Sequence, residues 1–256
     1  MIARGPGRRI GHTVHRLGAV TSTQGEAAAL ASAGAPDGTV VTATHQSAGR
    51  GRRGRSWLDA PGDSLLMSLV LRPPIPPGRA PQLSLVAAVA VVDALRAAGI
   101  TAAIRWPNDV MVAERKICGM LPEAVTTREG TLEHVILGIG LNVNQSEFPG
   151  SLHAVATSAR IETGRPHAVD DMLEAVLASL DYWYTRFVEG GLAALRLAWL
   201  ERAQSIGRRS RAADGREGIA VDLDADGALL LRADSGETMR VVAGEVMTEA
   251  VHAAGH

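Results

Sequence analysis

A run of arginines and glycines, AGRGRRGRSW at residues 48–57, is the clearest sign of chemistry in this sequence. Guanidinium groups are planar donors that suit phosphate and carboxylate oxygens, and glycines let the backbone bend and come close to a ligand. The stretch therefore predicts an anion-binding loop that is mobile when empty and ordered by its anion. A solvated basic hairpin tip is the alternative. A Walker loop is excluded, because no Gly-Lys-Ser/Thr follows.

RWPND (105–109) places polar groups directly after a predicted strand. Pro107 ends the strand ladder, and Asn108 with Asp109 favours a turn. The pentapeptide alone fits an ordinary turn, and it fits equally a carboxylate at Asp109 that accepts a hydrogen bond or faces a metal.

ERKICGML (114–121) begins another predicted strand. Period-2 alternation predicts Lys116, Cys118 and Met120 on one face. Lys116 then either snorkels at a sheet edge or points into a ligand site, and Gly119 leaves room for a ligand or another backbone to approach. Cys118 is expected to be a small buried hydrophobe. Two other stretches, TSTQ (21–24) and GIGLNVN (138–144), fit a helix cap and a strand end, or polar groups facing a ligand.

Composition narrows the choice of ligand. The chain has 256 residues, 46% of them apolar, and a formal net charge of −1. Proteins that grip nucleic acid usually carry a basic surplus, so locally concentrated arginines in a balanced chain favour a small anionic ligand. A single cysteine excludes a disulfide framework. The N-terminus has no apolar run typical of a secretion signal, and the apolar stretch 83–95 is short and carries Asp93, so we expect a cytoplasmic protein.

The surrounding pattern predicts elements that position these motifs. Strands are expected at 39–44, 63–71, 102–106, 109–113, 116–124 and 134–144, and helices at 26–33, 81–98, 170–189 (capped by Asp170 or Asp171) and 192–203. Residues 144–168 read as a long polar loop, a candidate lid. From about 206, short alternating runs with DG and SG turns predict a small β-domain. We therefore expect an arm at 1–12, a catalytic domain at 13–204 and a β-barrel at 205–256, with the boundary near 203–207.

In this order and spacing, QSAGRGRRGRSW, RWPNDV, K-x-x-G-M-L and GIGLNVN resemble the biotin–protein ligase family, biotin–[acetyl-CoA-carboxylase] ligases. The resemblance runs from about Thr21 to the C-terminal β-domain. It implies an α/β (α+β) fold, a class II aminoacyl-tRNA synthetase-like catalytic domain followed by an SH3-like β-barrel. It also implies the activity: ATP and Mg²⁺ convert biotin to biotinoyl-5′-AMP, which is then transferred to a lysine of a biotin carboxyl carrier domain. The ligase region begins almost at once, so we expect no N-terminal DNA-binding domain and no repressor role.

The same resemblance implies roles for individual residues. Lys116 and Arg52 are the expected catalytic residues. The biotin site is expected to comprise Ser22, Thr23, Gln46, Gly49, Arg50, Arg52, Lys116 and Gly119. The ATP and adenylate site is expected to comprise Arg53, Arg55, Trp57, Asn108, Asp109 and Asn142, with Asp109 the candidate metal ligand.

Two residues depart from the family pattern. Arg105 stands where the family usually has lysine, and Gln24 stands where it usually has asparagine; neither is assigned a role. The alternative function is a lipoate or octanoyl ligase of the same fold. A non-enzymatic RNA-binding module is disfavoured by the balanced charge and by an aromatic content of 3%. We expect no nucleic-acid or membrane partner, and a monomer or weak homodimer.

Overall fold

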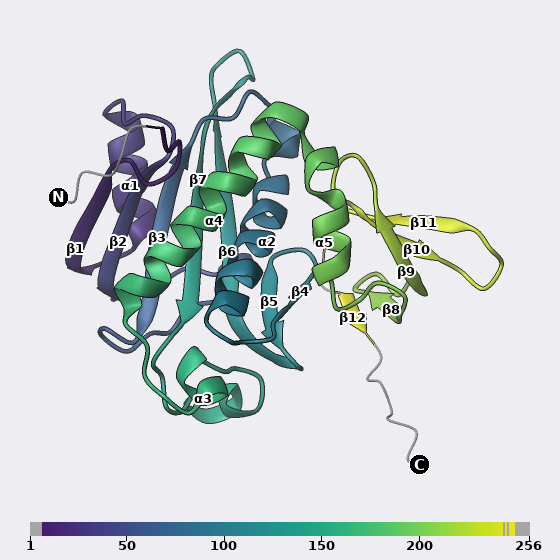
Figure 1. Ribbon diagram of the computed structural model, residues 1–256. Coiled ribbons are helices and arrows are strands. Elements are labelled where there is room, and N and C mark those ends of the chain that lie inside the picture. The colour runs from purple at the N-terminus through teal and green to yellow at the C-terminus, as the bar shows by residue number, and fades with distance from the viewer. Residues whose placement is uncertain (1–6, 243, 245, 249–256) are drawn as a thin grey trace.

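The computed structural model describes residues 7–242, 244 and 246–248, and builds them around two sheets (Figure 1). The larger sheet has seven strands in the order β1-β2-β3-β7-β6-β5-β4. Their bounds are β1 (Val14–Val20), β2 (Thr39–Gln46), β3 (Ser64–Leu71), β4 (Ala103–Arg105), β5 (Asp109–Val112), β6 (Arg115–Thr126) and β7 (Leu132–Asn142). β1 runs parallel to β2, and every other neighbouring pair is antiparallel.

The two faces of this sheet have different cover. Alternate residues of β3 and β7, such as Leu69 and Leu137, face a large core beneath α2 (Gln82–Ala97) and α4 (Val169–Gly190). The residues between them, such as Val70 and Ile136, pack against α1 (Thr23–Ser32) on the opposite face. α1 packs on β2, β3 and β7, so the part of that second face over β6 is left open to a cavity.

α2 is the most deeply buried helix of the catalytic region. Residues 77–97 are by length and composition apolar enough to cross a membrane, but 78% of an 18-residue apolar window within them is buried inside the fold. Alternating small and branched apolar residues suit a helix surrounded on most sides by the core. The sequence-based prediction of a buried helix at 81–98 is confirmed.

The second sheet is antiparallel and has five strands in the order β11-β10-β9-β8-β12. Its strands are β8 (Arg209–Ala212), β9 (Glu217–Leu223), β10 (Leu229–Arg232), β11 (Thr238–Val241) and β12 (Val246–Thr248). It follows α5 (Arg196–Arg202) and starts two residues beyond the predicted boundary region. The mixed α/β class with a C-terminal β-domain is confirmed.

Several local predictions are wrong. Residues 9–12 are not a loose arm, because Ile10 is buried and the backbone N–H groups of Arg9 and Ile10 donate to Asp181 Oδ1 at 2.7 and 2.8 Å. Residues 1–6 of that arm, and 249–256 of the β-barrel, lie outside the described residues.

Two helix starts and one loop also differ from the prediction. α1 begins at Thr23, capped by the Ser22 hydroxyl. Ala168 is the N-cap of α4, so Asp170 and Asp171 lie in its first turn. The segment 144–168 contains a 3₁₀ turn at Gly150–Ala154 and the short helix α3 (Ala159–Thr163).

Candidate active site

Two adjoining cavities lie on the sheet face that α1 leaves open. The first is small and lies between α1, β2, β6 and β7. The second, about 540 Å³, extends from the basic loop across β4 and β5 to the segment 148–156. Both cavities are lined by Gly51, Arg52, Trp57, Asn108 and Lys116. These five residues are called the junction below.

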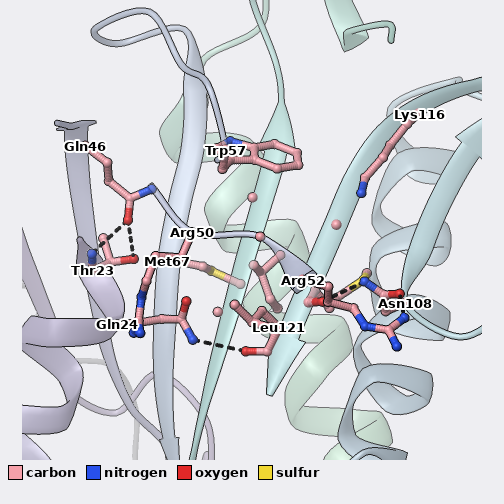
Figure 2. Close-up of a pocket in the computed structure, with 16 residues that line it drawn as sticks. Thr23, Gln24, Gln46, Arg50, Arg52, Trp57, Met67, Asn108, Lys116 and Leu121 are labelled. Atoms are coloured by element: carbon pink, nitrogen blue, oxygen red, sulfur yellow. Dashed lines mark hydrogen bonds between the residues drawn. The ribbon is translucent and has the colours of Figure 1, made fainter. Parts of the chain in front are cut away.

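The inner end of the first cavity holds an ordered amide and hydroxyl network. The Thr23 backbone N–H and hydroxyl donate to Gln46 Oε1 at 2.8 and 3.0 Å, and the Thr23 hydroxyl lies 2.8 Å from Ser68 Oγ. Because Gln46 Oε1 is held by two donors, the orientation of the amide is fixed and its nitrogen points toward the cavity (Figure 2). This arrangement can recognise a neutral polar group rather than an anion.

Gln24, which was left without a role, lines the same cavity. Its side chain is buried, donates from Nε2 to Leu121 O at 3.2 Å, and lies against Gly138 (Figure 2). A Cβ on Gly138 would approach Gln24 Cδ to 2.9 Å. Sequence reasoning missed it because a helix-start glutamine carries no signal by itself; only the bare Gly138 opposite makes room for it.

Glycines of β6 and β7 form the floor of the junction. The Trp57 ring lies over Gly140 and Gly119, where an added Cβ would approach ring atoms to 2.6 and 3.2 Å. The indole N–H of Trp57 is buried and has no hydrogen-bond partner among the described residues. The glycines thus let a large aromatic ring lie flat on the sheet, between the two cavities.

The basic loop forms a narrow hairpin rather than an open coil. Gly51 N–H donates to Arg55 O at 2.7 Å and Trp57 N–H to Gly49 O at 3.0 Å. A Cβ on Gly49 would lie 2.5 Å from Trp57 O, so this position requires glycine.

Two side chains tie the hairpin to the sheet. Arg50 donates to Glu123 Oε2 at 2.8 Å, and Arg52 donates to Asn108 Oδ1 at 2.6 Å. Arg52 thereby reaches the junction, while Arg50 reaches Glu123, closer to the C-terminal end of β6.

Lys116 reaches the junction through an irregularity in β6. The register with β5 shifts, so that Val110 pairs with Cys118 and Met111 with Lys116, leaving Ile117 as an extra residue. Such a bulge breaks strict alternation, and the prediction that Lys116 and Cys118 share a face is wrong. Cys118 is buried in the core, whereas Lys116 Nζ lies over Gly119 and 5.7 Å from the centre of the Trp57 ring.

An acid faces this lysine. Lys116 Nζ forms an ion pair with Asp109 Oδ1 at 2.7 Å, across the β5–β6 pairing, and both side chains are partly exposed to the cavity. The lysine backbone is also fixed, because its N–H donates to Val155 O at 2.8 Å and its carbonyl accepts from Thr157 N–H at 2.9 Å. The segment predicted as a lid is therefore hydrogen-bonded to β6 at this point.

The second cavity collects the residues predicted to contact the nucleotide. Arg53, Arg55, Trp57, Asn108, Asp109 and Asn142 all line it. Asn142 is buried and donates to Thr157 O at 2.9 Å, which holds the segment 155–157 beside β7. Arg105 also lines it and donates to Glu114 Oε2 at 2.6 Å, so the arginine that replaces the usual lysine is paired with an acid.

Of the residues predicted to contact biotin, Thr23, Gln46, Arg50, Arg52, Lys116 and Gly119 line the first cavity. Ser22 and Gly49 do not. Ser22 caps α1 by accepting from Gln24 N–H at 3.3 Å, and Gly49 allows the hairpin to close on Trp57. The polar neighbour that lines the cavity is Gln24, two residues along from Ser22.

Metal binding could involve Asp109. The described residues contain no group of three or more His, Cys, Asp or Glu side chains placed to hold an ion. Magnesium is commonly held by one or two carboxylates together with substrate phosphates and water. Asp109 and Glu114 are the carboxylates among the described residues that line the cavity, and Glu114 is paired with Arg105, so the lining fits that mode rather than an all-protein cage.

Comparison with known proteins gives consistent matches. Residues 17–142 match the Biotin/lipoate A/B protein ligase family, and residues 208–247 match the biotin protein ligase C-terminal domain. The chain is 40% identical to a bifunctional ligase/repressor of Bacillus spizizenii over 85% of this chain and 68% of that protein. It is 39% identical to a biotin–[acetyl-CoA-carboxylase] ligase of Paracoccus denitrificans, over 86% of this chain and 94% of the relative.

A solved structure resembles the whole arrangement. A biotin protein ligase from Aquifex aeolicus, in complex with biotin and ATP, superposes with a TM-score of 0.78 at 28% identity. The match covers 93% of this chain and 98% of that one.

Proposed function

The chain belongs to the Biotin/lipoate A/B protein ligase family, and we propose that it is a biotin–protein ligase. It activates biotin with ATP as biotinoyl-5′-AMP and transfers the biotinoyl group to a lysine of a biotin carboxyl carrier domain. The observation that carries this proposal is the junction, where a cavity with neutral amide recognition meets a cavity with arginines, and Arg52 and Lys116 line both.

Activation joins two anions, so the junction must supply positive charge. A biotin carboxylate oxygen attacks the α-phosphorus of ATP, the new O–P bond forms, and the bond to the pyrophosphate oxygen breaks. Lys116 stands where this charge moves from carboxylate to leaving group, and a fixed cation at such a place stabilises the transition state. Arg52 reaches the same place from the basic loop and holds the adenylate after pyrophosphate leaves. When the substrates bind, Lys116 gives up its ion pair with Asp109 and contacts the reacting oxygens instead.

Magnesium would be held by Asp109 together with oxygens of ATP, where it would neutralise charge on the departing pyrophosphate. The other loop arginines of the second cavity, Arg53 and Arg55, bind the phosphates. Trp57 lies between the bicyclic ring of biotin and the nucleotide, and its buried indole N–H donates a hydrogen bond to the intermediate.

Transfer then consumes the mixed anhydride. The neutral amine of the acceptor lysine attacks the biotinoyl carbonyl carbon, the amide bond forms, and the bond from that carbon to the AMP oxygen breaks. The amine loses its proton as the amide forms. AMP leaves from the cavity that held ATP.

The first cavity favours biotin over an unbranched acyl chain. The orientation of Gln46 is fixed by Thr23, and Gln24 adds a second amide opposite, which suits the donors and acceptor of a ureido ring. A site built around buried polar groups rejects a ligand that leaves them unpaired. Lipoate or octanoate would offer no ureido group to the Gln46 amide nitrogen or to the Gln24 amide oxygen.

The direct test is transfer of labelled biotin to a purified biotin carboxyl carrier domain, with ATP and Mg²⁺. We expect label on one lysine of the acceptor, dependence on ATP, and no competition from excess lipoate or octanoate. Transfer of octanoate or lipoate in place of biotin would overturn the proposal in favour of the other branch of the family.

A further inference from the structure

One turn of the second sheet reaches the edge of the active site. The turn at 224–228 joins β9 to β10, and two of its carbonyls accept hydrogen bonds from the first sheet's domain. Trp106 Nε1 donates to Gly227 O at 3.0 Å, and Gln82 Nε2 at the start of α2 donates to Ala225 O at 3.0 Å. Trp106 stands two residues before Asn108, which belongs to the junction.

The turn has the features of a rigid block. Asp224 Oδ1 accepts from the backbone N–H groups of Asp226 and Ala228, both at 2.9 Å. Arg240 of β11 hydrogen-bonds to Asp224 and, at 2.8 Å, to Asp226. The acid–base contacts and the turn hydrogen bonds fix the two carbonyls that face Trp106 and Gln82.

The turn also packs closely on α2 at position 227, where the backbone favours glycine. Gly227 has a φ of +86°, and an added Cβ would lie 2.8 Å from Leu85 Cδ1. Left-handed backbone and close approach both favour glycine here. The second sheet is therefore seated against the catalytic domain at a defined point.

Trp106 connects the 224–228 turn to the active site because it lies in a tight hairpin. Arg105 pairs with Asp109 at the ends of β4 and β5, and Trp106, Pro107 and Asn108 form the turn between them. Trp106 is buried with the core and held from the outside by Gly227.

Asn108 is held from the inside of the same hairpin. Its side-chain amide nitrogen donates to Met120 O at 2.9 Å, and its backbone carbonyl accepts from Met120 N–H at 3.0 Å. Trp106 and Pro107 line both the second cavity and a further cavity beside the 224–228 turn, so they are the wall between the two.

We propose that Trp106 is a positioning residue, through which the 224–228 turn sets where Asn108 and Asp109 stand in the nucleotide cavity. The second sheet then acts on the ATP-dependent step. Biotin binding is affected far less. Thr23 and Gln24 belong to α1 and Gln46 to β2, which stands near the opposite edge of the sheet from β4 and β5. The inference rests on the proposed function.

Two variants that disturb different contacts test the proposal, and a third variant is a matched control. Trp106→Phe keeps an aromatic ring in the core and removes the N–H donor. Gly227→Ala adds a methyl group that meets Leu85. Gly236→Ala is the control, since Gly236 has nearly the same φ, +87°, in the β10–β11 turn, and an added Cβ there meets no described atom within 4 Å. Gly227→Ala and Gly236→Ala therefore share the backbone strain, and only Gly227→Ala disturbs the contact with α2.

The measurements are the KM for ATP and kcat in biotin-dependent pyrophosphate release, and the Kd for biotin by calorimetry, each with a thermal melt. We expect Trp106→Phe and Gly227→Ala to lose about tenfold or more in kcat/KM for ATP, because small displacements of positioning groups have large kinetic effects. We expect their biotin Kd to stay within about twofold of the parent, and Gly236→Ala to match the parent.

The inference is overturned if Gly227→Ala behaves as Gly236→Ala does, or if biotin affinity falls by the same factor as ATP use. Trp106→Phe decides the matter alone if Gly227→Ala does not fold. Failure of the proposed function is a separate result, because the parent itself would then release no pyrophosphate with biotin and ATP.

Discussion

The basic loop and the sheet face beneath it hold their cations in different ways. Lys116 is fixed by backbone hydrogen bonds to Val155 and Thr157 and by its pairing with β5. The loop arginines extend from a hairpin whose tip, 53–56, is exposed, and side-chain contacts such as Arg50 with Glu123 tie it to the sheet. The strand ladder fixes the backbone of Lys116, so only its side chain has to change partner when a ligand enters, whereas both the backbone and the side chains of the loop arginines can move. The comparison predicts that Lys116 serves the activation step and that the loop serves capture and retention.

Removing the sheet cation should have the largest effect. Lys116→Ala should lower the rate of biotin-dependent pyrophosphate release by roughly 100-fold or more, as loss of one preorganised electrostatic group often does. Stopped assays of pyrophosphate, with biotin and ATP saturating, measure this. A fall of less than about tenfold in that rate, with collapse of acceptor transfer, would move Lys116 to the second step.

Removing a loop cation should act on the intermediate instead. Arg52→Gly deletes the contact with Asn108 and loosens the hairpin, so adenylate should form and then escape. A lost charge-assisted hydrogen bond is worth about 1.5–3 kcal/mol, so we expect a ratio of carrier biotinylation to labelling of a bystander protein that is lower by roughly 10- to 100-fold. A variant that makes adenylate yet keeps the parent's ratio would place retention elsewhere, on the segment 144–168.

The loop itself should change its protection when ligand binds. Amides of residues 47–57 should exchange quickly in the free protein and slowly with biotin or biotinoyl-AMP, because few buried contacts hold the hairpin tip. Amides of β7, which pairs with strands on both sides, should be protected in both states. Fast exchange of the loop in both states, with biotin bound, would remove the distinction between loop and sheet.

The smallest effect concerns the sheet's own thiol. Burial raises the pKa of the Cys118 thiol well above its usual range, more than Lys116 nearby lowers it. Because the thiolate is the reactive form, alkylating reagents at mildly alkaline pH should label Cys118 only after denaturation. Labelling of the native protein with loss of activity would show that β6 opens at the junction.

Much of the site could be predicted from the sequence because its residues are contiguous in motifs. The arginine run, RWPND and K-x-x-G each carry a local signal, and the structure places Lys116, Arg52 and Asn108 together. The same holds for the second sheet, whose DG and SG turns mark its hairpins. Local backbone chemistry is enough to locate such features.

What could not be predicted depends on irregular or distant contacts. The bulge at Ile117 reverses the face of Lys116 relative to Cys118, and alternation alone cannot reveal it. Gln24 enters the cavity only because Gly138, far along the chain, lacks a side chain. The hydrogen bond from Trp106 to Gly227 joins the β4–β5 turn to the β9–β10 turn, and neither residue signals it locally.

The most direct test of the division between sheet and loop is recovery of enzyme-bound adenylate. Enzyme, biotin and ATP labelled in the α-phosphate are mixed without acceptor and passed at once through a desalting column. We expect about one labelled adenylate per parent molecule, little product from Lys116→Ala, and product from Arg52→Gly that is formed but elutes free of the protein. Equal retention of label by the parent and Arg52→Gly, or normal synthesis by Lys116→Ala, would contradict it.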